Sequence, residues 1–217
     1  YIVVEEHNNG GKTSYTNWGI DTMLKNTHIV DGIRDLDYPV DWIHLSYFDA
    51  LLNIDVGKLR RRVGNACIIS TDLCGAGILA NSELRSNLER DCEHIDFIFM
   101  NEEEREMLTG SSAYINANVK RSVIVHAPNR TSITSTRKSI PVMKNDLPSN
   151  NITTRTIHNN PCACSNPVGL GDMLVAHTIA NLFASKNLSF ESVCRSIEYA
   201  SAKINEYCSP IDAELHE

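Results

Sequence analysis

The sequence predicts an α/β fold in which a mostly parallel sheet is covered by helices on both faces. Short apolar runs of strand length alternate with helical segments along most of the 217 residues. A chain of this length can bury the core of one sizeable α/β domain. Its hydrophobic content of 42% and charged content of 22% are ordinary for a globular protein.

The expected elements follow in order along the chain. Two β-rich runs, 1–6 and 12–17, flank an Asn/Gly turn and predict a hairpin, and a helical turn is expected at 20–25. The following elements alternate between strand and helix: strand 42–46, helix 51–62, strand 66–72, helix 82–90, strand 95–100, a capped helix from 101 to 110 and strand 119–125.

The last third of the chain departs from strict alternation. Segment 132–142 is polar and β-branched, which is typical of an antiparallel edge strand, whereas 143–160 is rich in Asn, Ser and Thr and is predicted as a loop. Two helices, about 171–185 and 189–207, complete the expected layer. Because ligands gather at the carboxyl ends of parallel strands, we expect the functional residues there.

The segment Gly169-Leu170-Gly171-Asp172, followed by an apolar helix, carries the strongest functional signal. Glycines allow a tight turn and close approach to a ligand, and the free N–H groups of a helix start attract phosphate. A carboxylate beside such an anion cradle suits phosphoryl transfer to a hydroxyl. The plainer interpretation is an ordinary helix start, in which Asp caps the first turn.

A second motif follows the strand at 95–100. Asn101 is expected to cap a helix that has three glutamates in its first turn and ends at Gly110. A well-capped surface helix would account for most of these residues. However, the spacing of Asn101 and Glu104 also puts both side chains at one helix end, where they could hold the water ligands of Mg²⁺.

The two motifs together resemble those of the ribokinase-like (PfkB) carbohydrate and nucleoside kinases. The order and separation of Asn101-x-x-Glu104 and Gly169-x-Gly171-Asp172 fit, and the strand ending in Asp72 is similar to a later strand of the family. The resemblance covers about residues 1–208. It implies a three-layer ribokinase-like fold with a mostly parallel central sheet, helices on both faces and a small β lid hairpin.

The resemblance also implies roles for these residues. Asp172 would be the general base that takes the proton of the acceptor hydroxyl. The residues Gly169, Leu170 and Gly171 would form the anion hole for the transferred phosphoryl group. The cofactor would be Mg²⁺ and the co-substrate ATP.

The metal and the nucleotide phosphates would be organised by the second motif. By resemblance, Asn101 and Glu104 would associate with Mg²⁺ through water molecules. Two minor candidates stay outside this list: His126 at a strand end, which could touch a phosphate, and Asp72, which could approach Mg²⁺. Each has a structural interpretation that we favour.

The chain departs from the family pattern near the nucleotide. Family members carry a Thr/Lys-x-Gly-x-x-Gly turn, but here Pro128 and Thr131 stand where the glycines would be. Proline fixes its backbone angle and lacks a donor, so the nucleotide site is altered or the loop is rebuilt. Before the anion hole, Asn166-Pro167 replaces Asp-Thr.

The resemblance places the opening hairpin well inside a family member, as part of the lid over the substrate. The preceding strands and sugar-binding Asp of the family have no counterpart in the sequence, which implies a chain without its N-terminal segment. We therefore expect residues 1–17 to form the lid hairpin and residues 18–217 to form an N-terminally incomplete α/β kinase core. A homodimer through the lid is a further expectation.

Charge and cysteine content narrow the class of protein. A net charge of −7 argues against a nucleic-acid partner, and no segment reaches membrane-spanning length. Seven cysteines without paired spacing indicate reduced thiols in a cytoplasmic protein. Cys162 and Cys164, near His158, lack enough partners of suitable spacing for a metal site.

The sequence thus favours an ATP-dependent phosphotransferase acting on an alcohol group of a sugar or nucleoside. The alternative is a non-catalytic relative or fragment that binds nucleotide or a protein partner. A generic dinucleotide-binding protein ranks last, because no strand-linked GxGxxG is present. The residues that would determine which alcohol is the acceptor are expected in the missing N-terminal segment, so the sequence does not name the acceptor.

Overall fold

A computed structural model describes residues 2–6, 12–16, 39–46, 54–73, 75, 78–108, 110–138, 150–159 and 169–208. Its centre is a six-stranded sheet in the order β3-β4-β5-β6-β7-β8. The first four strands are parallel, and the last two continue the sheet in antiparallel pairing. The strands are β3 (Trp42–Leu45), β4 (Ile68–Asp72), β5 (Phe97–Asn101), β6 (Ser122–Ala127), β7 (Arg130–Lys138) and β8 (Asn150–His158).

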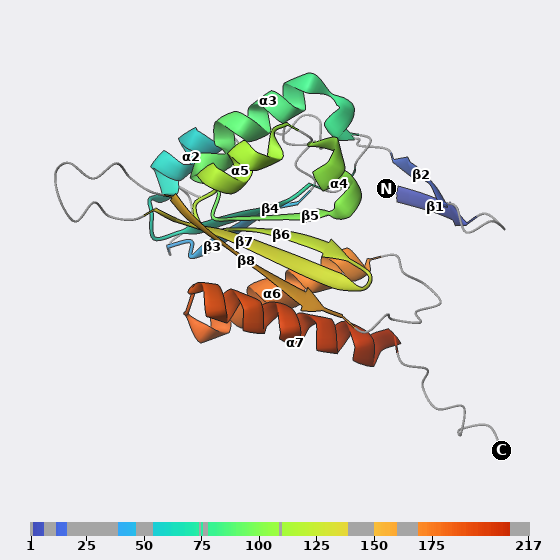
Figure 1. Ribbon diagram of the computed structural model, residues 1–217. Coiled ribbons are helices and arrows are strands. Elements are labelled where there is room, and N and C mark those ends of the chain that lie inside the picture. Colours follow the sequence, from blue (N-terminus) through green and yellow to red (C-terminus); the bar gives the residue numbers. More distant parts are fainter. Residues whose placement is uncertain are drawn as a thin grey trace, which may run out of the picture.

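Helices cover both faces of this sheet and give three layers (Figure 1). One face carries α2 (Val56–Val63), α3 (Ser82–Asp91), α4 (Glu102–Met107) and α5 (Ser112–Asn118), with short 3₁₀ turns η3 (Ile78–Ala80) and η4 (Cys92–His94). The other face carries α6 (Leu170–Ser185) and α7 (Phe190–Cys208). The expectation of a mostly parallel sheet between two helical layers is confirmed.

The alternating side chains of β5 explain why both faces need a cover. Ile98 and Met100 belong to the core beneath α2–α5, whereas Phe97 and Phe99 belong to the core beneath α6 and α7. All four side chains are buried. A strand that is apolar on both faces is typical of the centre of a parallel sheet, because each face is packed against helices.

Short polar residues fix where the helices begin. Asp55 accepts a hydrogen bond from the Lys58 N–H (2.8 Å) and caps α2, and Asn81 accepts one from the Glu83 N–H (2.9 Å) and caps α3. The helix expected at 51–62 therefore begins at Val56 among the described residues. The helical turn expected at 20–25 lies outside them.

A buried ion pair fastens α2 to the sheet. The Arg60 guanidinium donates to the Asp96 carboxylate (2.5 Å), which also accepts from the Ile69 N–H (2.9 Å) and from Arg121 Nε (3.2 Å). Arg60 and Asp96 are 6% and 1% exposed, so the pair has little access to water. Removing the Asp96 carboxylate would leave the buried Arg60 guanidinium without a counter-charge, whereas Asp96 would keep Arg121 as an ionic partner if Arg60 were removed.

The predicted N-terminal hairpin is present as a separate two-stranded sheet. Strands β1 (Ile2–Glu6) and β2 (Lys12–Thr16) pair antiparallel, with Ile2 opposite Thr16 and Glu6 opposite Lys12. The turn between them lies outside the described residues. Its function as a lid stays a prediction.

Strand β8, helix α5 and the start of β7 differ from the sequence prediction. The prediction of a loop over 143–160 is wrong for residues 150–158, which form β8 and pair with β7 along their whole length. Its Thr and Ile residues are β-branched, and pairing with a neighbouring strand decides the conformation despite the Asn-rich composition. Helix α5 is absent from the sequence prediction, and β7 begins at Arg130 rather than at 132.

The cysteines only partly follow the expected reduced state. Cys67, Cys92 and Cys194 are free, buried thiols, whereas Cys208 takes part in a disulfide. Burial raises the pKa of the Cys92 thiol to about 11, which keeps it protonated at neutral pH. Within the described ranges, no helix is both long enough and apolar enough to cross a membrane.

Candidate active site

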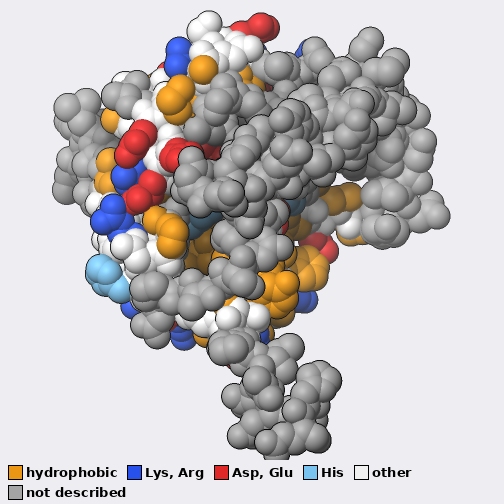
Figure 2. Space-filling model, turned by 90° about the vertical axis from the view of Figure 1, so that its right-hand side faces the viewer, with side chains coloured by type: hydrophobic (Ala, Val, Ile, Leu, Met, Phe, Trp, Pro, Cys, Tyr) orange, Lys and Arg blue, Asp and Glu red, His pale blue; other side chains and the backbone are white. Residues whose placement is uncertain are grey.

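The candidate site lies at the carboxyl edge of the parallel strands. β4 ends at Asp72 and β5 at Asn101, and His126 is the penultimate residue of β6. Asn101 and His126 are direct partners in the β5–β6 register. Figure 2 looks at this side of the molecule, where acidic and basic side chains lie next to one another rather than in a patch of one sign.

Asn101 and Glu104 form a reciprocal cap at the start of α4. The Glu104 N–H donates to Asn101 Oδ1 (2.8 Å), and the Asn101 N–H donates to Glu104 Oε2 (2.8 Å). The other carboxylate oxygen, Oε1, accepts from the Gly75 N–H (2.6 Å). Glu104 therefore joins the end of β5 to the segment that follows β4, and the residue is 2% exposed.

The environment of Glu104 disfavours its negative charge. Burial is the largest cause, and the nearby charge of Asp72 adds to it, so the pKa of Glu104 is raised to about 7 despite two backbone hydrogen bonds. A divalent cation near these carboxylates would relieve that cost. The donor set of one amide oxygen and two carboxylates also suits Mg²⁺, which is held by few protein oxygens and keeps several waters.

Helix α6 begins next to the β5 and β6 ends. A Cβ atom placed on Gly171 would lie 3.2 Å from His126 Cε1 and 3.6 Å from its Nε2, so this glycine is in close contact with the imidazole. His126 therefore bridges Asn101, its register partner on β5, and the first turn of α6. Burial lowers the pKa of His126 to about 4, so the ring is neutral at pH 7.

Helix α6 begins at a glycine N-cap. Gly169 is the N-cap and adopts a left-handed conformation (φ 82°, ψ 0°), with no side chain capping the turn. The first intrahelical bond runs from the Met173 N–H to the Gly169 carbonyl (2.9 Å). The N–H groups of Leu170, Gly171 and Asp172 precede it and are not used by the helix.

Asp172 occupies the third position of α6 and is exposed. The described residues therefore do not enclose the Asp172 carboxylate. Asp172 directly follows Gly171, which contacts His126. Segment 160–168, which leads into Gly169 and includes Asn166 and Pro167, lies outside the described residues.

The turn at the position where the resemblance would place a glycine-rich turn is a tight hairpin between β6 and β7. Ala127 pairs with Arg130, which leaves Pro128 and Asn129 as its two central residues. Arg130 donates from Nε (2.9 Å) and from a terminal nitrogen (2.7 Å) to Glu102 in the first turn of α4. The turn is thus fastened to the helix that carries Glu104.

Asn159, just after β8, is hydrogen-bonded to the β6–β7 turn and to β7. Its N–H donates to the Asn129 carbonyl (2.9 Å), and its side-chain amide donates to Thr131 Oγ1 (3.2 Å). Its Oδ1 atom is buried and accepts no hydrogen bond from the described residues. Thr131, where the resemblance would place a glycine, is fully buried opposite His126, and its hydroxyl accepts the hydrogen bond from Asn159.

The structure brings together Asn101, Glu104, Gly171 and the minor candidate His126. Sequence reasoning did not find the Arg130–Glu102 pair or the position of Asn159, because it predicts a loop in place of β8 and no local pattern marks a contact between distant segments. Among the described residues, no group of three or more His, Cys, Asp or Glu side chains forms a ready metal cluster. A metal here would therefore depend on water and on the phosphates of a ligand.

Comparisons with known proteins identify the fold. No protein-family model matches the sequence, and no curated protein sequence matches it significantly. Solved structures do match. A nucleoside kinase of Burkholderia thailandensis is 12% identical with a TM-score of 0.64, and the match covers 93% of this chain and 60% of that one.

Two further matches have similar coverage. A protein described as ribokinase II of E. coli is 19% identical with a TM-score of 0.62, covering 94% of this chain and 63% of that one. A fructokinase of Vibrio cholerae is 14% identical with a TM-score of 0.62, covering 94% and 65%. The chain thus spans less than two thirds of the length of each of these neighbours, and it has the ribokinase-like (PfkB) fold.

Proposed function

We propose that the chain belongs to an ATP-dependent phosphotransferase that acts on an alcohol group of a sugar or nucleoside. The observation that carries this proposal is the contact between Gly171 and His126, the register partner of Asn101. It joins the two sequence motifs at one edge of the sheet. Phosphoryl transfer needs such joint positioning and charge stabilisation more than covalent chemistry.

Asp172 is the proposed general base. Its carboxylate would take the proton of the acceptor hydroxyl while the hydroxyl oxygen forms a bond to the γ-phosphorus of ATP. The bond from that phosphorus to the β–γ bridging oxygen would break, and ADP would leave with the electron pair. The N–H groups of Leu170, Gly171 and Asp172, at the positive end of α6, would stabilise the charge on the transferred group.

Asn101 and Glu104 are the proposed holders of Mg²⁺, through water. The metal would neutralise charge on the nucleotide phosphates. The raised pKa of Glu104 supports this role, because burial and, to a lesser extent, the charge of Asp72 disfavour its anionic form, and a cation would offset that cost. Among the structural neighbours, E. coli ribokinase II was solved with ATP and Mg²⁺, and the V. cholerae fructokinase with fructose, ADP and calcium.

The neighbours also support a small-molecule acceptor, since the B. thailandensis kinase was solved with inosine. The range extends further, to a pyridoxal kinase of Leishmania donovani solved with ADP and pyridoxamine. We keep sugar or nucleoside as the proposed acceptor because the chain carries the β1–β2 hairpin, which we propose to act as a lid and as a site of homodimerisation. A cytoplasmic location completes the proposal.

A second candidate function is nucleotide or protein binding without turnover. The tight Pro128–Asn129 turn favours it, because Arg130 is tied to Glu102 and the turn lacks the glycines that expose amides to phosphate. A protein with this function would still bind an anion at the start of α6 but would not transfer phosphate to an acceptor hydroxyl.

Replacement of Asp172 by Asn tests the catalytic role. Transfer of phosphate from Mg-ATP to ribose, fructose, adenosine and inosine is measured with the full 217-residue chain, and calorimetry follows ATP binding. We expect D172N to lose about 10²–10⁴-fold in turnover while it keeps ATP binding. The matched control is Glu191→Gln, an exposed acidic residue in the first turn of α7, which should leave turnover unchanged.

Near-wild-type turnover in D172N would remove the general-base assignment. Nucleotide binding by the wild-type chain without transfer to any acceptor would favour the second function. Neither binding nor transfer would overturn both.

A further inference from the structure

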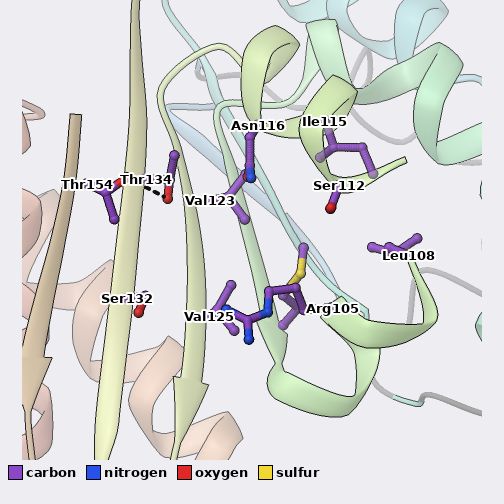
Figure 3. A pocket seen from close by; sticks show the side chains of 11 residues that line it. Arg105, Leu108, Ser112, Ile115, Asn116, Val123, Val125, Ser132, Thr134 and Thr154 are labelled. Carbon is purple, nitrogen blue, oxygen red and sulfur yellow. Dashed lines mark hydrogen bonds between the residues drawn. The ribbon is translucent and has the colours of Figure 1, made fainter. Parts of the chain in front are cut away.

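A cavity of about 130 Å³ lies on the α2–α5 face of the sheet, on the opposite side from α6. Its floor is made of buried apolar side chains, and its walls combine one arginine with hydroxyl and amide side chains (Figure 3). The apolar residues are Met100, Leu108, Ile115, Val123 and Val125, and the polar ones are Arg105, Ser112, Asn116, Ser132, Thr134 and Thr154. None of these residues takes part in the proposed phosphoryl transfer.

Arg105 supplies the charge of this cavity. Its side chain extends from α4 across the opening, and Ser112 and Asn116 point toward it from α5 (Figure 3). Among the described residues, its one ion pair is a 4.0 Å approach to Glu102 Oε1. That same oxygen already accepts two hydrogen bonds from Arg130, so most of the Arg105 donors remain available to a ligand.

The strand side of the cavity offers hydroxyl groups. The Thr134 and Thr154 hydroxyls are 3.3 Å apart, and Ser132 Oγ is 3.4 Å from Thr156 Oγ1. These are long contacts for hydroxyl pairs, which prefer about 2.7–2.8 Å, so the groups can turn toward a better partner. Within the described ranges, no acidic side chain lines the cavity.

We propose that this cavity binds a small hydroxycarboxylate. The carboxylate would pair with the Arg105 guanidinium, whose forked donors match two carboxylate oxygens. The short carbon skeleton would lie on the apolar floor, and the alcohol group would exchange hydrogen bonds with Ser112, Ser132 or Thr134. A cavity of about 150 Å³ holds a benzene-sized molecule, so the ligand has about six to nine non-hydrogen atoms.

The location of the cavity would let such a ligand influence the candidate active site through helix α4. Arg105 follows Glu104 directly on α4, a helix of six residues that begins at the Asn101 cap. A ligand carboxylate bound to Arg105 would replace the 4.0 Å ion pair between Arg105 and Glu102. Glu102 also accepts a hydrogen bond from Arg130 at the β6–β7 turn. Binding would therefore act on the helix that holds the proposed Mg²⁺ residues.

Calorimetry and NMR on the full chain test the proposal without any need for activity. The probes are L-lactate and L-malate, with propane-1,2-diol as the analogue of lactate without a carboxylate, and inorganic phosphate as another anion, all at matched ionic strength. We expect the two hydroxy acids to bind and to shift the Arg105 Nε–H resonance. The diol should do neither, and phosphate should bind more weakly than the hydroxy acids.

Four variants localise the binding. Arg105→Gln should weaken it about 10- to 100-fold, as expected for a charge-assisted contact, and Thr134→Val about 2- to 10-fold. Arg195→Gln, which changes an exposed arginine on α7, should leave it unchanged. Arg105 is half-exposed, so the glutamine variant should fold, and Ser112→Leu, which fills the cavity, gives a second way to abolish binding.

Equal binding to wild type and Arg105→Gln would place the ligand elsewhere and overturn the proposal. Tighter binding of phosphate than of both hydroxy acids would reject the ligand class. No heat and no NMR shift with either hydroxy acid would reject the site. None of these results depends on whether the chain is a kinase.

Discussion

The buried carboxylate of Glu104 makes the free energy of unfolding depend on pH. The substitution Glu104→Gln removes this titrating group and so isolates its contribution. Its pKa is raised from an ordinary 4.5 to about 7, chiefly by burial. Well below pH 4.5 the residue is protonated in both the folded and the unfolded chain. Between 4.5 and 7 the unfolded chain releases this proton and the folded chain keeps it, so the stability contribution is lost as pH rises.

The size of the loss follows from the shift in pKa. One unit corresponds to about 1.36 kcal/mol, so the Glu104 contribution to the free energy of unfolding falls by about 3 kcal/mol from about pH 4.5 to about pH 8. In Glu104→Gln the group no longer titrates and this component is absent. The amide oxygen can accept from only one of the Asn101 and Gly75 N–H groups, which adds a constant cost without a pH dependence.

Urea unfolding followed by circular dichroism, from about pH 4.5 to about pH 8 with EDTA, measures the effect. The stability of wild type relative to Glu104→Gln should decline across this range, because all other titrations cancel in the difference. Glu103→Gln is the matched control, since Glu103 is an exposed neighbour in the same helical turn and its difference should stay flat. A flat difference for Glu104→Gln would refute the argument that this carboxylate is destabilised by its surroundings.

Three further substitutions test the fold and the site. Asp96→Asn leaves the buried Arg60 cation without its partner and should cost about 3–5 kcal/mol in urea unfolding, and a cost below about 1 kcal/mol would contradict the ion pair. Gly169→Ala puts a side chain at φ 82° in open space, so backbone strain alone should cost about 1–2 kcal/mol in thermal unfolding. Gly171→Ala should push the His126 ring away by a few tenths of an ångström, and unchanged His126 NMR resonances would contradict that contact.

Sequence reasoning predicted the central architecture because its signals are local. Apolar runs such as Phe97–Met100 and the cap Asn101 act within a few residues, and the sheet and helices form where they indicate. Strand β8 was missed for the opposite reason. Its Thr-rich sequence becomes a strand by pairing with β7, and that partner cannot be read from the segment itself.

The candidate site was predictable as residue types but not as contacts. The positions of Asn101 and Gly171 came from motifs, whereas their connection through His126 depends on strand register and on the way α6 packs. His126 carried no more local signal than any other histidine at a strand end. The cavity around Arg105 could not be predicted from the sequence either. Separate helices and strands supply its walls, and one of these elements, α5, is absent from the sequence prediction.

The charges at this edge constrain how a nucleotide could be held. The resemblance would place a phosphate-contacting residue at His126, yet its pKa of about 4 leaves the ring neutral, so it can offer only a ring hydrogen bond. Arg130, at the β6–β7 turn, donates two hydrogen bonds to Glu102. Among the described residues at this edge, the amide end of α6 would supply positive charge for the phosphates, together with Mg²⁺ held near Glu104. If the chain binds ATP, its affinity should therefore collapse when EDTA removes the metal.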